Sequence, residues 1–176
     1  MKDKYFIEII LTNDKKIRVC LDSKFAPKSV ENFVNLVEKK YFDGVIFHRI
    51  IKDFMIQTGG YKINEKFELV ETDEIPSIVG EFASNGFTEN TLSHDLGVIS
   101  MARTSIKDSA TSQFFICSAK CTWLDGEYAA FGYCMDEESK KVVLEISNVE
   151  TYRAHPSFVD FPCEIIAIKT INFIEE

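Results

Sequence analysis

The sequence has no surplus of basic residues. Its 20 Lys and Arg residues stand against 28 Asp and Glu residues, which gives a formal net charge of −8 at pH 7. Such a chain cannot neutralise a phosphate backbone through bulk charge, so we expect no nucleic-acid partner. The same charge disfavours docking on an anionic membrane surface, so we expect no membrane partner either.

The sequence also lacks a membrane-spanning run, a secretion signal and a disulfide framework. The apolar stretch Tyr5–Leu11 is short and contains Glu8, and no run approaches the roughly 18 apolar residues of a membrane span. The 5 cysteines are an odd and scattered set, which argues against a network of disulfides. We therefore expect a cytoplasmic protein, because free cysteines suit a reducing compartment.

Metal ligands at the usual spacing are missing too. Cys117 and Cys121 are close in sequence, but no second Cys or His pair stands nearby at the spacing of a metal site. No strained turn motif surrounds any cysteine, so the sequence does not indicate a cysteine nucleophile. We expect neither a metal nor a cofactor.

The composition that remains is that of a globular domain. The chain has 176 residues, of which 45% are hydrophobic and 27% charged, and 15 are Phe. This length favours one compact domain, residues 1–176, with enough apolar side chains for a core. Phe side chains in such number can also line an apolar pocket.

Apolar periodicity predicts many short strands and two helices. Val30, Phe33, Val34 and Val37 have the spacing of an amphipathic helix, and Pro27 suits its first turn. Strands are expected at Tyr5–Leu11, Lys16–Leu21, Val45–Ile50, Phe54–Thr58, Gly97–Met101, Gln113–Ser118, Phe131–Met135 and Cys163–Phe173, a second helix at Glu137–Asn148, and a long acidic loop at about Tyr61–Leu96. This pattern predicts a β-barrel or β-sandwich with two helices.

Three motifs, in this order, carry a family resemblance. They are FHRIIKDFMIQTGG at Phe47–Gly60, GVISMARTSIKDSATSQFFI at Gly97–Ile116 and WLDGEYAAFG at Trp123–Gly132. Together they resemble the cyclophilins, and the SMART…DSATSQFF variant resembles the bacterial branch. The resemblance implies a mainly β fold, a closed eight-stranded antiparallel β-barrel capped by two α-helices. It also implies peptidyl-prolyl cis–trans isomerase activity that assists protein folding.

The implied reaction requires no covalent intermediate. Resonance in the peptide bond sets a rotation barrier of about 18–20 kcal/mol. An enzyme must favour the twisted amide, whose nitrogen has left conjugation and become basic. A charged donor beside an apolar, water-excluding pocket can do this. Arg49 matches the family's catalytic arginine, and a guanidinium keeps its charge near neutral pH.

The resemblance also assigns the surrounding residues. Gln57 matches the glutamine that contacts the substrate backbone and helps to position the arginine. Arg103 is expected to act through its main chain, and Trp123 matches the tryptophan associated with cyclosporin binding. The implied proline pocket comprises Phe54, Met55, Phe115 and Leu124, and the implied peptide groove and rim comprise Ala102, Arg103, Gln113, Trp123 and Tyr128. Apart from the motifs, the apolar members would be interpreted as core residues and Arg49 as a surface ion-pair partner.

Several residues depart from the family pattern and leave other functions open. Lys52-Asp53 replaces the frequent Pro-Gly, Thr58 replaces a glycine, and Tyr128 stands where many members have His. One alternative is a proline-peptide binding module without catalysis. Another is an assembly protein that docks through its acidic loop. The expected partners of the first interpretation are proline-containing segments of unfolded or flexible proteins, with cyclosporin as a candidate ligand, and we expect a monomer.

Overall fold

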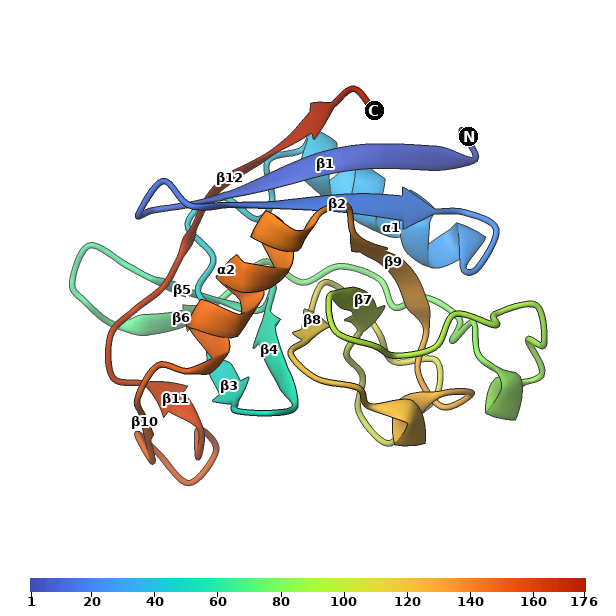
Figure 1. Ribbon diagram of the computed structural model, residues 1–176. Helices are drawn as coiled ribbons and strands as arrows, with labels where there is room; N and C mark the ends of the chain where they lie inside the picture. Colours follow the sequence, from blue (N-terminus) through green and yellow to red (C-terminus); the bar gives the residue numbers. More distant parts are fainter.

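Eight strands form one antiparallel sheet in the computed structural model, which describes all residues from 1 to 176 (Figure 1). Their spatial order is β12-β1-β2-β9-β7-β8-β4-β3. Their bounds are β1 Lys4–Leu11, β2 Lys16–Asp22, β3 Arg49–Ile51, β4 Met55–Thr58, β7 Val98–Met101, β8 Phe114–Cys117, β9 Ala130–Cys134 and β12 Ile168–Ile174. Because β1 and β12 pair, the two chain ends lie near each other.

The sheet curves into an open half-barrel, so the expected closed barrel is not what forms. The edge strands β3 and β12 share no ladder. The chain before β3 instead makes single backbone contacts with the chain around β12, such as Phe47 N to Ile166 O at 2.9 Å and Ile168 N to Val45 O at 2.8 Å. Regular pairing in β3 begins only at Arg49, beyond the segment that faces β12, so isolated bonds replace the last ladder.

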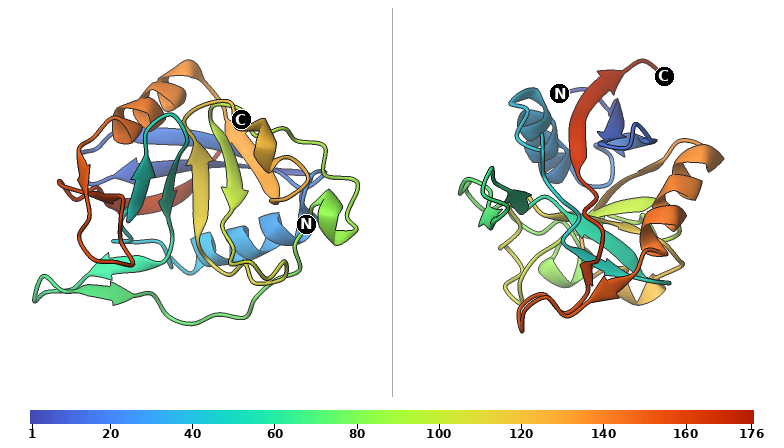
Figure 2. Two further views of the ribbon diagram at one scale, coloured as in Figure 1. Left: turned by 90° about the horizontal axis from the view of Figure 1, so that it is seen from below. Right: turned by 90° about the vertical axis from the view of Figure 1, so that its left-hand side faces the viewer.

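Two helices, α1 Pro27–Glu38 and α2 Glu137–Ser147, lie on opposite sides of the strands (Figure 2). Both agree with the expected helices to within a few residues at their ends. The apolar side of α1 is buried, as its spacing predicted, and the Phe33 ring lies 5.0 Å from Phe42 and 5.1 Å from Phe114. Neither helix has the length and apolar composition of a membrane span.

The N-terminus of α1 takes its cap from a distant loop. Ala26 precedes the helix and has no side chain that could accept a hydrogen bond. The buried carboxylate of Glu81 accepts bonds from the backbone N–H groups of Lys28 at 3.1 Å and Ser29 at 2.6 Å. An anion at this position satisfies free N–H groups and opposes the helix dipole, so it anchors the acidic loop to α1.

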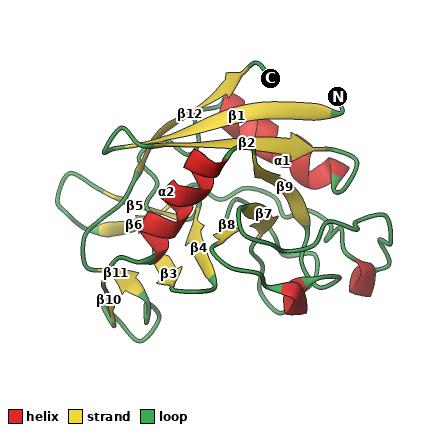
Figure 3. Cartoon of the chain, viewed as in Figure 1, coloured by secondary structure: helices red, strands yellow, loops and turns green.

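The acidic loop is less irregular than its sequence suggested. Its first part forms a hairpin of β5 Tyr61–Ile63 and β6 Leu69–Glu71, and a short 3₁₀ helix, η1, spans Ala83–Asn85. The rest, up to β7, is drawn mainly as loop in Figure 3.

Three features elsewhere in the chain differ from the expected elements. Two elements were not predicted: a second small hairpin, β10 Thr151–Tyr152 and β11 Phe161–Pro162, and the 3₁₀ helix η2 at Thr122–Leu124. The last strand also starts later than expected. Elements of two or three residues are too short for a periodic signal.

Candidate functional site

Strand pairing brings the two expected catalytic residues face to face. In the antiparallel pair β3–β4, Arg49 stands opposite Gln57. On the next strand, β8, Phe115 also stands opposite Gln57. Residues directly opposite on neighbouring strands point to the same face of the sheet. Arg49, Gln57 and Phe115 therefore form one row across three strands.

A short chain of hydrogen bonds orients the polar members of this row. Arg49 Nη1 donates to Gln57 Oε1 at 3.1 Å, and Gln57 Nε2 donates to Gln113 Oε1 at 2.9 Å. The Arg49 side chain makes no ion pair within the chain and is exposed. Since a guanidinium has five N–H donors, most of those of Arg49 stay available for a ligand.

A cavity of about 210 Å³ lies beside this row. Its lining consists of Arg49, Phe54, Met55, Gln57, Ala102, Arg103, Phe115, Leu124 and Tyr128. Met55, Phe115 and Leu124 are buried and belong to a small hydrophobic cluster separate from the main core. The site is thus an apolar hollow with one free cation at its edge.

Two expected site residues lie just outside the cavity. Gln113 lines a neighbouring cavity of about 170 Å³, which shares Gln57, Ala102 and Arg103 with the first. The Trp123 side chain is 62% exposed, and its ring centroid lies 5.7 Å from that of Phe54. Its indole is therefore positioned to extend the apolar surface rather than to line the hollow.

Comparison with known proteins decides the family. The model of the family described as "Cyclophilin type peptidyl-prolyl cis-trans isomerase/CLD" matches residues 6–171. The chain belongs to this cyclophilin family. The resemblance was based on three motifs and their order, and the match to the family model confirms it.

Bacterial relatives match nearly the whole cyclophilin chain. Peptidyl-prolyl cis-trans isomerase A of Dickeya dadantii is 38% identical over 96% of this chain and 84% of its own length. A peptidyl-prolyl cis-trans isomerase of Acinetobacter baylyi is 41% identical over 92% of this chain and 84% of its own length. These matches identify the activity as cis–trans isomerisation of the peptide bond before proline.

Solved cyclophilin structures share the fold along the full chain. A crystal structure of a cyclophilin type peptidyl-prolyl cis-trans isomerase from Cryptosporidium parvum has a TM-score of 0.75 at 26% identity and covers 98% of this chain and 99% of that chain. A second structure of that protein, in the presence of the dipeptide Ala-Pro, has a TM-score of 0.74 at 26% identity. The half-barrel is therefore the cyclophilin fold.

Arg103 has a side-chain position that the sequence did not predict. Its guanidinium donates to the carbonyl oxygen of Glu127, with Nη2 at 2.7 Å, and lies 4.5 Å from the centroid of the Tyr128 ring. Tyr128 in turn meets Phe115 edge to face at 5.9 Å. Stacking of this kind stabilises both side chains, so Tyr128 is held in place as a wall of the cavity.

His94 is a second contribution that the sequence did not reveal. It belongs to a loop, yet it is fully buried and lies stacked beside Phe115. Its Nδ1 is 2.9 Å from Asp125 Oδ1 and its Nε2 is 2.9 Å from Ser100 Oγ. Burial lowers the pKa of His94, although Asp125 opposes the shift. Ser100 is completely buried, so this Ser–His–Asp series supports the pocket and presents no nucleophile.

His48 and the cysteines near the site are buried as well. Burial, together with the charge of Arg49, lowers the pKa of His48 to about 4, so this imidazole is neutral at pH 7. Burial raises the pKa of both Cys117 and Cys121, which keeps their thiols protonated and poorly reactive. These groups pack around the site and carry no charge in it.

The departures from the family pattern have local structural solutions. Asp53 occupies the left-handed backbone region at φ 59, which Gly favours but Asp tolerates, and the turn closes with Phe54 N bonded to Ile51 O at 3.1 Å. Thr58 is buried and donates its hydroxyl to Ile46 O at 2.7 Å. Asp53 and Thr58 thus both fit the local backbone, one just before β4 and the other at its end.

Proposed function

We propose that Arg49 and the apolar cavity beside it carry out the isomerisation. The proline ring enters the hollow formed by Phe54, Met55, Phe115 and Leu124, and Arg49 donates to the twisted amide at the prolyl nitrogen or the adjacent carbonyl oxygen. The observation that carries this proposal is the 210 Å³ cavity with an unpaired guanidinium in its lining. A charged donor in a partly water-free site favours the state that accepts its hydrogen bond most strongly.

The remaining site residues hold the peptide on one side of the rotating bond. Gln57 keeps Arg49 in place, and its amide also faces the groove. The main-chain N–H and C=O of Arg103 have no hydrogen-bond partner within the protein, which supports a contact with the substrate backbone. Ala102, Gln113 and Tyr128 complete the groove. One end of the amide can turn while the other stays bound, and no covalent bond forms.

The proposed substrates are proline-containing segments of unfolded or flexible proteins. The structure of a relative in the presence of the dipeptide Ala-Pro supports this class of ligand. We also propose cyclosporin as a ligand, since the exposed Trp123 ring extends the apolar surface beside Phe54. A single domain of residues 1–176, a monomeric state and a cytoplasmic location complete the proposal.

Exchange measurements on an Ala-Pro peptide test this mechanism. Arg49→Ala should lower kcat/KM by about 100-fold or more, because one preorganised donor typically contributes that much. Arg49→Lys should retain part of the rate, since the charge remains but the fixed donor geometry is lost. Arg153→Ala, which removes an exposed arginine outside the cavity, is the matched control.

The outcome separates catalysis from mere binding. A wild-type rate equal to that of buffer, with measurable peptide affinity, would favour a proline-binding module. Equal activity of Arg49→Ala and Arg153→Ala would remove Arg49 from the mechanism while leaving the isomerase activity standing.

A further inference from the structure

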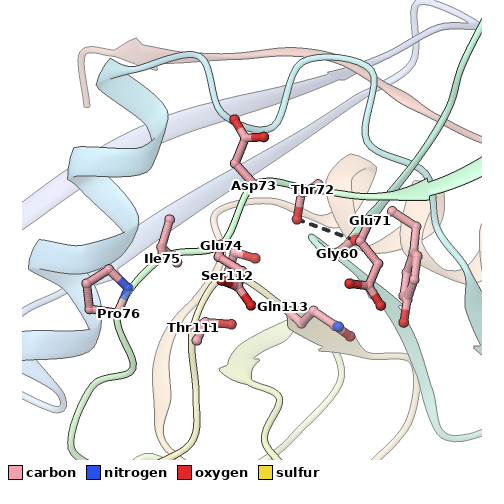
Figure 4. Close-up of a pocket in the computed structure, with 11 residues that line it drawn as sticks. Gly60, Glu71, Thr72, Asp73, Glu74, Ile75, Pro76, Thr111, Ser112 and Gln113 are labelled. Carbon is pink, nitrogen blue, oxygen red and sulfur yellow. Dashed lines mark hydrogen bonds between the residues drawn. The ribbon is translucent and has the colours of Figure 1, made fainter.

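A cavity of about 660 Å³ adjoins the groove just described (Figure 4). It lies between the end of the β5–β6 hairpin and the segment Thr111–Gln113. Thr111 and Gln113 also line the 170 Å³ cavity, which in turn shares Gln57 with the cavity beside Arg49. The three hollows are therefore neighbours with common lining residues, and a peptide that extends past Gln113 runs toward the 660 Å³ cavity.

The lining of this cavity is acidic and has no basic side chain. It includes Glu71, Asp73 and Glu74, while Ile75 and Pro76 supply an apolar wall. None of the three carboxylates takes part in an ion pair or a side-chain hydrogen bond within the chain. In Figure 4 the Glu71 carboxylate extends toward Gln113, and that of Asp73 points away from it. A lysine or arginine side chain matches both the acidic part and the apolar wall of this lining, because its stem is apolar and its head is cationic.

The main chain beside the cavity is also open to a ligand. The segment after β6 belongs to no regular element, and the backbone N–H and C=O groups of Glu74 and Ile75 have no partner in the protein. Unpaired backbone groups can bond to an extended peptide. Tyr41 Oη holds this segment in place, at 2.8 Å from Thr72 Oγ1, 2.6 Å from Asp73 O and 3.3 Å from Ser112 Oγ. The cavity is thus formed before any peptide arrives.

We propose that this cavity is a subsite for a lysine or arginine side chain of the substrate, which makes basic proline-containing segments the preferred class. The substrate backbone runs along Glu74 and Ile75, its cationic head lies among Glu71 and Glu74, and its stem contacts Ile75. The proposal rests on the peptide groove proposed above, of which the cavity is the continuation. Exposed charges contribute modestly each, so the effect is a preference among substrates rather than an absolute requirement.

Peptides that carry one lysine test the subsite. Isomerisation of an alanine peptide with a central Ala-Pro is compared with that of peptides in which Lys, or Glu, replaces each alanine in turn on both sides of the proline. At one position the Lys peptide should exceed the Glu peptide in kcat/KM by about threefold to tenfold at low salt. The ratio should fall toward one as ionic strength rises, because exposed charges are screened.

A pair of variants shows whether the preference is local. The double variant Glu71→Gln/Glu74→Gln should bring the Lys-to-Glu ratio close to one. Glu65→Gln/Glu68→Gln, which removes the same charge from the tip of the same hairpin, should leave the ratio as in the wild type. Circular dichroism of both variants verifies that the fold is retained.

Two results would overturn the subsite. One is an equal rate for Lys and Glu peptides at every position, and the other is an equal loss of preference in the two double variants, which would indicate the general field of an acidic protein. A failure of the proposed proline site would give a different result from a failure of the subsite. The alanine peptide with a central Ala-Pro would then be isomerised no faster than in buffer.

Discussion

Arg49 depends on neighbours that are set by different parts of the chain. Gln57 orients it from β4, and Phe115 supplies the floor of the adjoining cavity from β8. Behind Phe115 lies His94, which links Ser100 to Asp125 by two hydrogen bonds of 2.9 Å. At the scale of single residues, the geometry of the site thus depends on a buried imidazole that does not line the cavity.

Replacement of His94 by Leu should therefore weaken both the fold and the site. The change leaves the buried hydroxyl of Ser100 without its hydrogen-bond partner, and an unsatisfied buried polar group costs about 1–3 kcal/mol. We expect a decrease of that size in the free energy of unfolding and a lower kcat, because Phe115 loses the ring beside it. Urea unfolding and the isomerase assay measure both, and His155→Leu in an exposed loop is the control. Equal behaviour of the two variants would show that His94 is dispensable.

At the scale of elements, the two helices are capped in different ways. Asp136 caps α2 from the adjacent position in the chain, and its carboxylate accepts from Ser139 N at 2.7 Å. Hydrogen bonding from Ser139 lowers the pKa of the Asp136 carboxyl group. The cap of α1 comes from Glu81, 52 residues beyond Ser29 along the chain. Only the first of these caps has a signature that can be recognised in the sequence.

Loss of the distant cap should therefore destabilise the protein more than loss of an exposed charge. Glu81→Ala removes a buried acceptor of three hydrogen bonds from Lys28 and Ser29. We expect the free energy of unfolding to fall by about 2–3 kcal/mol. Glu137→Ala, in the exposed first turn of α2, is the control and should change it by less than about 0.5 kcal/mol. A Glu81 variant as stable as the control would refute the capping role.

At the scale of the whole molecule, one buried imidazole links stability to pH. The folded protein holds the pKa of His48 at about 4 through burial and the nearby Arg49, below the value of 6.5 for a free histidine. The unfolded chain therefore binds the proton more readily. Neutral His48 makes its full contribution to the free energy of unfolding above about pH 6.5. This contribution, up to about 3 kcal/mol, is lost as the pH falls toward 4.

Urea unfolding between pH 7 and pH 4.5 should reveal this linkage. The wild-type protein is expected to lose more stability over this interval than His48→Gln, which has no proton to bind at that position. His94 and the carboxylates Glu8 and Asp125, whose pKa values are also lowered, remain in both proteins and cancel in the difference. Parallel curves for the two proteins would contradict the assignment.

The order of amino acids was sufficient to predict the helices, most strands and most of the residues that line the cavity beside Arg49. Apolar spacing marked α1 because a helix repeats within a few residues, and strand alternation with three local motifs pointed to Arg49, Gln57 and Phe115. These signals lie within single segments, so they can be recognised without knowledge of the fold. The family comparisons confirm the isomerase activity that the motifs implied.

Packing between distant segments decided the rest. The sheet stayed open because the chain before β3 meets β12 through single bonds, and no local pattern reports such a meeting. No local pattern reports three other features either: the cap from Glu81, the stacking of the Arg103 guanidinium on Tyr128, and the burial of His94. Each of these depends on hydrogen-bond partners and burial that arise only when remote parts of the chain are brought together.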